Sequence, residues 1–260
     1  MPLADEFDGL LVDLDGVVWI GREPVPGSAE ALAALQTAGV ELVFVTNNPT
    51  KRPESYAKRL QGMGVEVGPE RIVTAGMTAA RLAGEAANGG GAFVIGAEPL
   101  KEMVAAAGAE PLTGEPAYAA TVVVVSGHRG FDFEELLTAK RALDAGAALV
   151  ATSHDPTMPM PGGEWPGTGS ILAAVETASG KTAVIGGKPE RHLFDLARAQ
   201  LGGAERVAMI GDRVSSDIAG GRAAGLATIL VLSGTTDEAE AAAADPAPDH
   251  VVADLAALLR

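Results

Sequence analysis

The chain has 260 residues, of which 47% are hydrophobic, and it carries a formal net charge of -15. This length suffices for one large or two ordinary domains, and the acidic balance disfavours a general binder of nucleic acid or anionic membranes. The absence of cysteine excludes disulfides, thiolate catalysis and thiolate metal sites. Without a basic, apolar leader or an apolar run long enough to cross a bilayer, the sequence predicts a cytoplasmic protein.

The first predicted strand, residues 10–12, ends abruptly in Asp13 and Asp15, and Gly16 then permits a sharp turn. Residues two apart in an extended chain point to the same side, so both carboxylates can face one ligand. Two such charges repel each other, and burying either of them alone is costly. A hard divalent cation such as Mg2+ would resolve this conflict, because it prefers carboxylate oxygens. An acidic turn without a ligand is the alternative for this segment taken alone.

The rest of the chain alternates apolar runs of strand length with helical patterns. Further strands are predicted at 42–45, 72–74, 93–95, 122–125, 149–151, 183–185, 207–210 and 228–232. Helices are predicted at 28–38 with Ser28 as the N-cap, at 53–63, from Thr78, at 98–107, 133–145 and 239–244. The segment 155–169 is rich in proline and glycine and reads as a long functional or mobile loop. This alternation predicts an α/β fold with a doubly wound parallel sheet.

Four polar segments each follow a predicted strand directly. They are Asp13-Leu14-Asp15, Thr46-Asn47-Asn48, Gly187-Lys188-Pro189, and Gly211-Asp212-Arg213 together with Asp217. In open α/β sheets, ligands bind at the carboxyl ends of the strands, near the point where the strand order reverses. We therefore expect these segments to converge on one cleft that contains carboxylates, a hydroxyl, amides and a lysine.

Taken in order, these segments resemble the motif set of the haloacid-dehalogenase-like (HAD) hydrolase superfamily. The Thr-Asn-Asn, Gly-Lys-Pro and Gly-Asp-Arg forms resemble its subfamily IIA, which includes p-nitrophenylphosphatases and phosphoglycolate, glycerol-phosphate and pyridoxal-phosphate phosphatases. The resemblance implies a Rossmann-like core with an inserted α/β cap domain of the C2 type. We place the core at residues 1–77 and 181–260 and the cap at 78–180.

The resemblance also implies a mechanism in which Asp13 is the nucleophile and forms an aspartyl-phosphate. Asp15 would protonate the leaving group and then deprotonate the hydrolytic water, which requires a pKa above the usual ~3.9. Mg2+ would be bound by the side chains of Asp13 and Asp212 and by the main-chain carbonyl of Asp15.

Four further residues complete the site that the resemblance implies. Thr46 and Asn47 would donate hydrogen bonds to phosphoryl oxygens, and Lys188 would neutralise charge in the transition state. Asp217 would hold a metal-bound water or orient Lys188. The alternatives are a helix-dipole role for Asp217 and a solvated turn position for Lys188.

Within the cap, Arg129 and the loop 154–170, including His154, are where we expect substrate contacts. The family's loop commonly begins Thr-Asn-Pro-Asp, whereas this chain has Thr152-Ser153-His154-Asp155. His128 stands where an acidic residue is frequent, and for both histidines a surface role is an equal alternative.

The reaction expected from these features is Mg2+-dependent hydrolysis of a small phosphorylated metabolite. Candidate substrates are phosphoglycolate, glycerol phosphate, pyridoxal phosphate and a sugar phosphate or nucleotide, and a homodimer is left open. The main alternative is a phosphotransferase or mutase on the same scaffold, with a hydroxyl in place of water. A receiver-type signalling module is disfavoured by the chain length and by the Asp13-x-Asp15 pair, and a silent sugar-phosphate binder by the intact aspartates.

Overall fold

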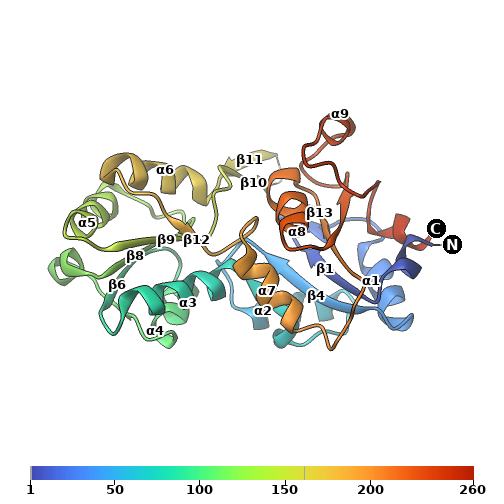
Figure 1. Cartoon of the computed structure of the whole chain (residues 1–260), viewed down its shortest axis with the longest axis horizontal. Coiled ribbons are helices and arrows are strands. Elements are labelled where there is room, and N and C mark those ends of the chain that lie inside the picture. The colour runs from blue at the N-terminus through green and yellow to red at the C-terminus, as the bar shows by residue number, and fades with distance from the viewer. Residues whose placement is uncertain (1, 161) are drawn as a thin grey trace.

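The structure, a computed structural model, describes residues 2–160 and 162–260. The chain forms two parallel sheets, each covered by helices on both faces, and the two layered units lie next to each other (Figure 1). Both termini lie together at the end of the molecule that is remote from the second sheet (Figure 1). Within the described residues, no helix combines the length and apolar character needed to cross a membrane.

The first sheet is built from both ends of the chain and has the strand order β15-β14-β13-β1-β4-β5. All its neighbours pair in parallel. Its strands are β1 (Gly9–Asp13), β4 (Glu41–Thr46), β5 (Ile72–Thr74), β13 (Val207–Gly211), β14 (Ala227–Val231) and β15 (His250–Val252). The order reverses between β1 and β13, so the predicted topological switch point lies at the carboxyl end of β1.

The residues of β1 alternate between the two faces of this sheet. Leu10 and Val12 pack in the same cluster as residues of α1 (Ser28–Thr37) and α2 (Pro53–Gly62). Leu11 points the other way, into a cluster with residues of α7 (Arg191–Ala199). Every residue of β1 is buried, which explains why this strand reads as a continuous apolar run rather than an alternating one.

The second sheet has the order β12-β9-β8-β6-β7 and is also parallel throughout. Its strands are β6 (Gly91–Ile95), β7 (Glu110–Pro111), β8 (Val122–Val125), β9 (Ala148–Ala151) and β12 (Val184–Ile185). On one face Val123 and Val125 pack with α5 (Phe133–Asp144) and α6 (Thr168–Ser179). On the other face Val122 and Val124 pack with α3 (Ala75–Ala87) and α4 (Glu98–Ala106). This unit is the inserted α/β cap.

Two hairpins and several short elements complete the fold. The hairpins pair β2 (Trp19–Ile20) with β3 (Glu23–Pro24), and β10 (Thr157–Met160) with β11 (Gly163–Pro166). Short helices are α8 (Ala219–Ala223) and α9 (Glu238–Ala242), and a π-helical turn, η4, spans Val214–Ile218. The 3-10 helices are η1 (Leu3–Glu6), η2 (Pro69–Arg71), η3 (Glu115–Ala119) and η5 (Leu255–Leu259).

The predicted fold class, a doubly wound core with an inserted α/β cap, is confirmed, but two local predictions are wrong. Ser28 is not an N-cap: it is the first residue of α1, and its hydroxyl donates to the carbonyl of Val18 at 3.0 Å. The segment 155–169 is not a plain loop, because most of it forms the β10–β11 hairpin, which lies between the two units (Figure 1).

The expected domain boundaries can be refined at both ends of the cap. Helix α3 begins directly after β5, where the Thr74 hydroxyl accepts a hydrogen bond from the Met77 backbone N–H at 3.4 Å. The strand expected at 183–185 had been assigned to the core, whereas β12 pairs with β9 in the second sheet. We therefore propose that the cap spans about residues 75–185, with Gly186 and Gly187 as the return to the core.

Candidate active site

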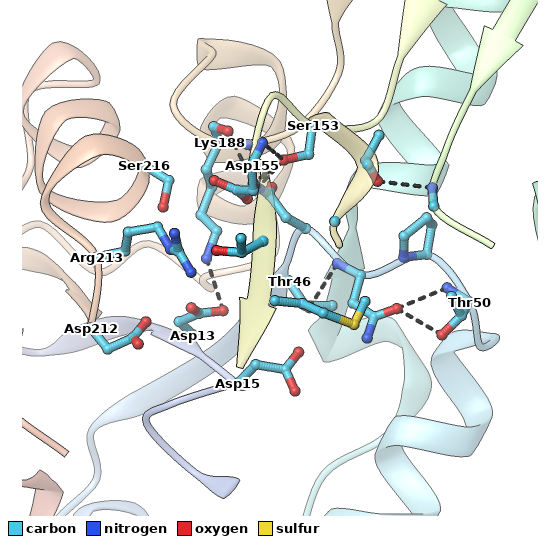
Figure 2. Close-up of a pocket in the computed structure, with 18 of the residues that line it drawn as sticks. Asp13, Asp15, Thr46, Thr50, Ser153, Asp155, Lys188, Asp212, Arg213 and Ser216 are labelled. Atoms are coloured by element: carbon cyan, nitrogen blue, oxygen red, sulfur yellow. Dashed lines mark hydrogen bonds and ion pairs between the residues drawn. The ribbon is translucent and has the colours of Figure 1, made fainter. Parts of the chain in front are cut away.

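The side chains predicted to act together meet at one end of the core sheet. Asp13 ends β1, Thr46 ends β4, and Asp212 follows β13. Lys188 lies on the segment that returns from the cap. All four are at most 7% exposed, and they line a cavity of about 110 Å³ whose wall also includes cap residues (Figure 2). The structure thus brings together strand ends that are far apart in the sequence.

Lys188 is the electrostatic centre of this group. Its Nζ lies 2.8 Å from Asp13 Oδ1 and 2.6 Å from Asp217 Oδ1, and the lysine is only 2% exposed. Burial alone would lower the pKa of Lys188, but the two carboxylates outweigh it and raise this pKa above its usual range. Lys188 is therefore a fixed ammonium and not a solvated turn residue. Of the two roles expected for Asp217, the contact fits the orientation of Lys188.

Burial has the opposite effect on the carboxylates. It raises the pKa of Asp13 well above the usual value, and Asp217 and Asp212 add to this rise while Lys188 opposes it. The pKa of Asp217 is raised for the same reasons, with burial the largest. The site therefore holds more negative charge than one lysine compensates.

The donor set fits a divalent cation. Oxygens of Asp13, Asp212 and Asp217 lie within 4.8 Å of one another, and all three residues are buried. Oδ1 of Asp217 contacts Lys188 at 2.6 Å, which leaves Asp13 and Asp212 as the side chains of this cluster that can hold a cation. Hard carboxylate oxygens with uncompensated charge are what Mg2+ prefers. The residues present are therefore suited to hold it.

Two glycines, Gly16 and Gly234, leave the space that the Asp212 carboxylate occupies. A Cβ at Gly16 would lie 2.3 Å from Asp212 Oδ2, and one at Gly234 would lie 2.1 Å from the same atom. Gly16 also has a φ of +85°, which side-chain-bearing residues rarely adopt. Asp212 Oδ2 accepts a hydrogen bond from the Thr235 backbone N–H at 2.7 Å, which fixes the carboxylate.

Asp15 lies two residues beyond the end of β1 and lines the same cavity. Its Oδ1 accepts a hydrogen bond from the indole N–H of Trp19 at 3.1 Å. Burial raises the pKa of Asp15, with the Trp19 hydrogen bond and Lys188 acting against that rise. The upward shift that an acid role requires is thus present, and desolvation causes it.

The Asn47 side chain is used differently from the expectation. Its amide nitrogen donates towards Ser153 Oγ (3.2 Å), Asp155 Oδ2 (2.8 Å) and the Lys188 carbonyl (3.0 Å). Its amide oxygen accepts from the Lys188 backbone N–H at 2.8 Å. The Asn47 amide thus links the end of β4 to the cap and to Lys188. If its nitrogen donated to a phosphoryl oxygen, that hydrogen bond would replace one of these. Thr46 lines the cavity, as expected of a phosphate-binding residue.

The cap residues Arg129 and His154 do not line the cavity. The guanidinium of Arg129 lies over the ring of Trp165, 4.3 Å from its centroid, and His154 is exposed. His128 pairs instead with Glu135, at 2.8 Å. A substrate contact by Arg129 or His154 remains an untested prediction.

The cavity wall also includes side chains that the sequence does not single out one by one, although those of the hairpin lie within the segment 154–170, where we expect substrate contacts. Arg213 and Ser216 come from the segment after β13, and Thr157, Met158 and Met160 come from the β10–β11 hairpin. Arg213 belongs to the Gly211-Asp212-Arg213 motif, and that motif could have identified it as a candidate site residue. The hairpin residues belong to no motif, and only the composition of the segment 155–169 points to them.

The structure thus combines a doubly wound core, an inserted α/β cap and an acidic cavity lined by residues of both units. Two family models match the chain: a haloacid dehalogenase-like hydrolase model over residues 10–110 and a HAD-hydrolase-like model over residues 172–258. The D-glycerol 3-phosphate phosphatase of Mycobacterium tuberculosis is 36% identical over 260 residues, which cover 98% of this chain and 72% of that protein. Chronophin of Mus musculus is 36% identical over 271 residues, covering 98% and 92%.

A solved structure gives the same result. Glycerol phosphate phosphatase from Mycobacterium tuberculosis, in complex with magnesium, superposes with a TM-score of 0.89 at 35% identity, covering 100% of this chain and 78% of that one. The chain therefore belongs to the haloacid dehalogenase-like hydrolases, which confirms the resemblance. The phosphatase relatives identify it as an enzyme of the phosphomonoesterase class and disfavour the mutase alternative.

Proposed function

We propose that this chain hydrolyses small phosphate monoesters by way of an aspartyl-phosphate on Asp13, with Mg2+ as the cofactor. The observation that carries the proposal is the arrangement of Asp13, Asp15 and Lys188 around one cavity. The buried carboxylate of Asp13 lies 2.8 Å from Lys188 Nζ. The carboxylate of Asp15, which has a raised pKa, lies just after the end of the same strand and lines the same cavity.

In the first step, a carboxylate oxygen of Asp13 attacks phosphorus and the bond from phosphorus to the ester oxygen breaks. Asp15 gives its proton to the departing oxygen, so the product leaves as an alcohol. In the second step, water attacks the same phosphorus as Asp15 takes its proton, and the bond to Asp13 breaks to release phosphate. Lys188 and the Thr46 hydroxyl stabilise charge on the phosphoryl oxygens.

Asp13 and Asp212, together with the main-chain carbonyl of Asp15, would hold Mg2+, while Asp217 keeps Lys188 in place. The bound cation offsets the excess carboxylate charge and that of the phosphoryl group. This assignment draws support from the solved phosphatase with magnesium.

Metal removal tests the assignment. Excess chelator should abolish hydrolysis, and Mg2+ should restore it, with Mn2+ or Co2+ as replacements and Ca2+ as an inhibitor because of its looser coordination. Mg2+ should also raise the Tm of the wild type, and Asp212→Asn should remove that rise, whereas Asp195→Asn on exposed α7 should keep it. Full activity in chelator would contradict the role of Asp212.

The cavity wall supports a neutral, hydroxylated leaving group. The wall offers hydroxyl groups from Thr50, Thr157 and Thr168 and the carboxylate of Asp155. Among the described lining residues, the cations are Lys188 and Arg213, both on the core side. A volume of about 110 Å³ is well below the roughly 300 Å³ of pockets for drug-sized ligands, so the leaving group is small. Glycerol phosphate meets these conditions better than phosphoglycolate or pyridoxal phosphate.

The test compares glycerol 3-phosphate with 3-phosphoglycerate, which differ at one end by a hydroxymethyl group in place of a carboxylate. The polyol phosphate should have the higher kcat/KM by roughly ten- to a hundredfold, the equivalent of ~1–3 kcal/mol. Asp155→Asn, which keeps an acceptor oxygen for Asn47 but removes the negative charge, should narrow that ratio. A preference for the carboxylated substrate would overturn the proposed substrate class.

A further inference from the structure

Trp19 contacts Asp15, the proposed acid–base residue, yet has no role in the mechanism above. It begins β2, it is 1% exposed, and its indole N–H donates to Asp15 Oδ1 at 3.1 Å. The backbones of the two residues also form a β-bridge, and the Gly16 N–H donates to the Trp19 carbonyl at 2.7 Å. The turn after the first strand is thus folded back onto this tryptophan.

The indole ring is itself held by two side chains of α2. Tyr56 stacks on it with a centroid distance of 6.4 Å and an interplanar angle of 5°. The guanidinium of Arg59 lies 3.8 Å from the ring centroid, and Arg59 Nη1 donates to the Gly21 carbonyl at 3.1 Å. A cation over the ring face is attracted to its π electrons, so these contacts fix the plane of the indole and the direction of its N–H.

We propose that Trp19 is a positioning residue that decides which oxygen of Asp15 transfers the proton. An oxygen that accepts a hydrogen bond is the less basic of the two, so the N–H on Oδ1 leaves Oδ2 as the oxygen that carries the proton. Because Asp15 faces the cavity, Oδ2 is then the atom that protonates the leaving ester oxygen and later takes a proton from water (Figure 2). This inference rests on the proposed acid–base role of Asp15.

The dependence on leaving group separates positioning from mere packing. A p-nitrophenolate can leave without being protonated, whereas the alkoxide oxygen of glycerol phosphate must receive a proton in order to leave. Trp19→Phe retains an aromatic ring that can contact Tyr56 and Arg59 but lacks the N–H. Its kcat/KM on glycerol 3-phosphate should fall by ~10–100-fold. Its kcat/KM on p-nitrophenyl phosphate, which reports formation of the aspartyl-phosphate and not its later hydrolysis, should stay within about threefold.

Two further variants control for a loss of activity that is caused by altered packing around position 19. An isosteric benzothienylalanine at position 19, which has sulfur in place of the N–H, should reproduce the selective loss even if Trp19→Phe folds poorly. Trp165→Phe makes the same chemical change at a tryptophan outside the cavity wall. It should leave the ratio of the kcat/KM values for glycerol 3-phosphate and p-nitrophenyl phosphate as in the wild type.

Asp15→Asn distinguishes failure of this inference from failure of the proposed function. Its kcat/KM on glycerol 3-phosphate should fall by more than that of either position-19 variant, and its kcat/KM on p-nitrophenyl phosphate should fall less. If Asp15→Asn affects both substrates equally, the acid role of Asp15 is wrong. The other outcome is that Asp15→Asn is selective while the position-19 variants lower kcat/KM for both substrates by one common factor. In that case Trp19 serves packing alone and the inference is overturned.

Discussion

Replacing Asp13 by Asn should abolish hydrolysis while the protein remains folded. The amide has nearly the same volume, and its oxygen can still accept the hydrogen bond that the Leu14 N–H gives to Asp13 Oδ1 at 2.8 Å. It cannot act as the attacking carboxylate, so kcat should fall by on the order of 10⁴-fold or more, the scale typical of a removed nucleophile. Steady-state assays with p-nitrophenyl phosphate would measure the loss.

The control for this prediction is Asp195→Asn, the same change on the exposed surface of α7. It should retain wild-type kcat. The Tm of Asp13→Asn should not fall, because Lys188 keeps its second partner, Asp217, at 2.6 Å. Substantial turnover by a correctly folded Asp13→Asn protein would rule out Asp13 as the nucleophile.

Lys188→Met should damage both activity and stability. Without the ammonium, the buried carboxylates of Asp13 and Asp217 have lost a partner that lies within 2.8 Å of each. Breaking a buried ion pair from one side costs about 3–5 kcal/mol, so the free energy of unfolding in chelator should drop by that amount. Loss of charge stabilisation should lower kcat by roughly 10²–10³-fold. Urea unfolding and steady-state kinetics measure the two effects.

A second substitution identifies the cause of the instability. Adding Asp217→Asn to Lys188→Met removes one of the stranded charges and should recover part of the lost unfolding free energy without restoring kcat. If the single variant is as stable as the wild type, or if the double variant is less stable than the single one, the ion-pair account of this cluster is incorrect.

The core site was predictable because its chemistry is local to strand ends. Asp13 interrupts an apolar run, and in a parallel sheet the carboxyl ends of such runs share one edge. Lys188 could be assigned from its motif alone, although its two carboxylate partners come from opposite ends of the chain. The role of Asn47 was harder to foresee, because its side chain binds residues 106 to 141 positions away.

The cap was less predictable for two physical reasons. Short strands such as β7 and β10 carry too little periodicity to be recognised, and they exist through pairing with partners. The functional direction of a cap side chain also depends on tertiary contacts. Arg129 is drawn to Trp165 on the hairpin, and that cation–π contact leaves no mark in the local sequence. Trp19 reads as an ordinary core residue until Asp15 is seen beside its N–H.

Direct capture of the covalent intermediate tests the central claim most sharply. Wild-type enzyme turning over p-nitrophenyl phosphate with Mg2+ would be quenched rapidly, treated with borohydride and digested for mass spectrometry. Borohydride reduces an aspartyl-phosphate to homoserine, so the account predicts homoserine at position 13, in amounts that depend on substrate. Homoserine at another aspartate, or none during verified steady-state turnover in which breakdown of the intermediate limits the rate, would contradict Asp13 as the nucleophile.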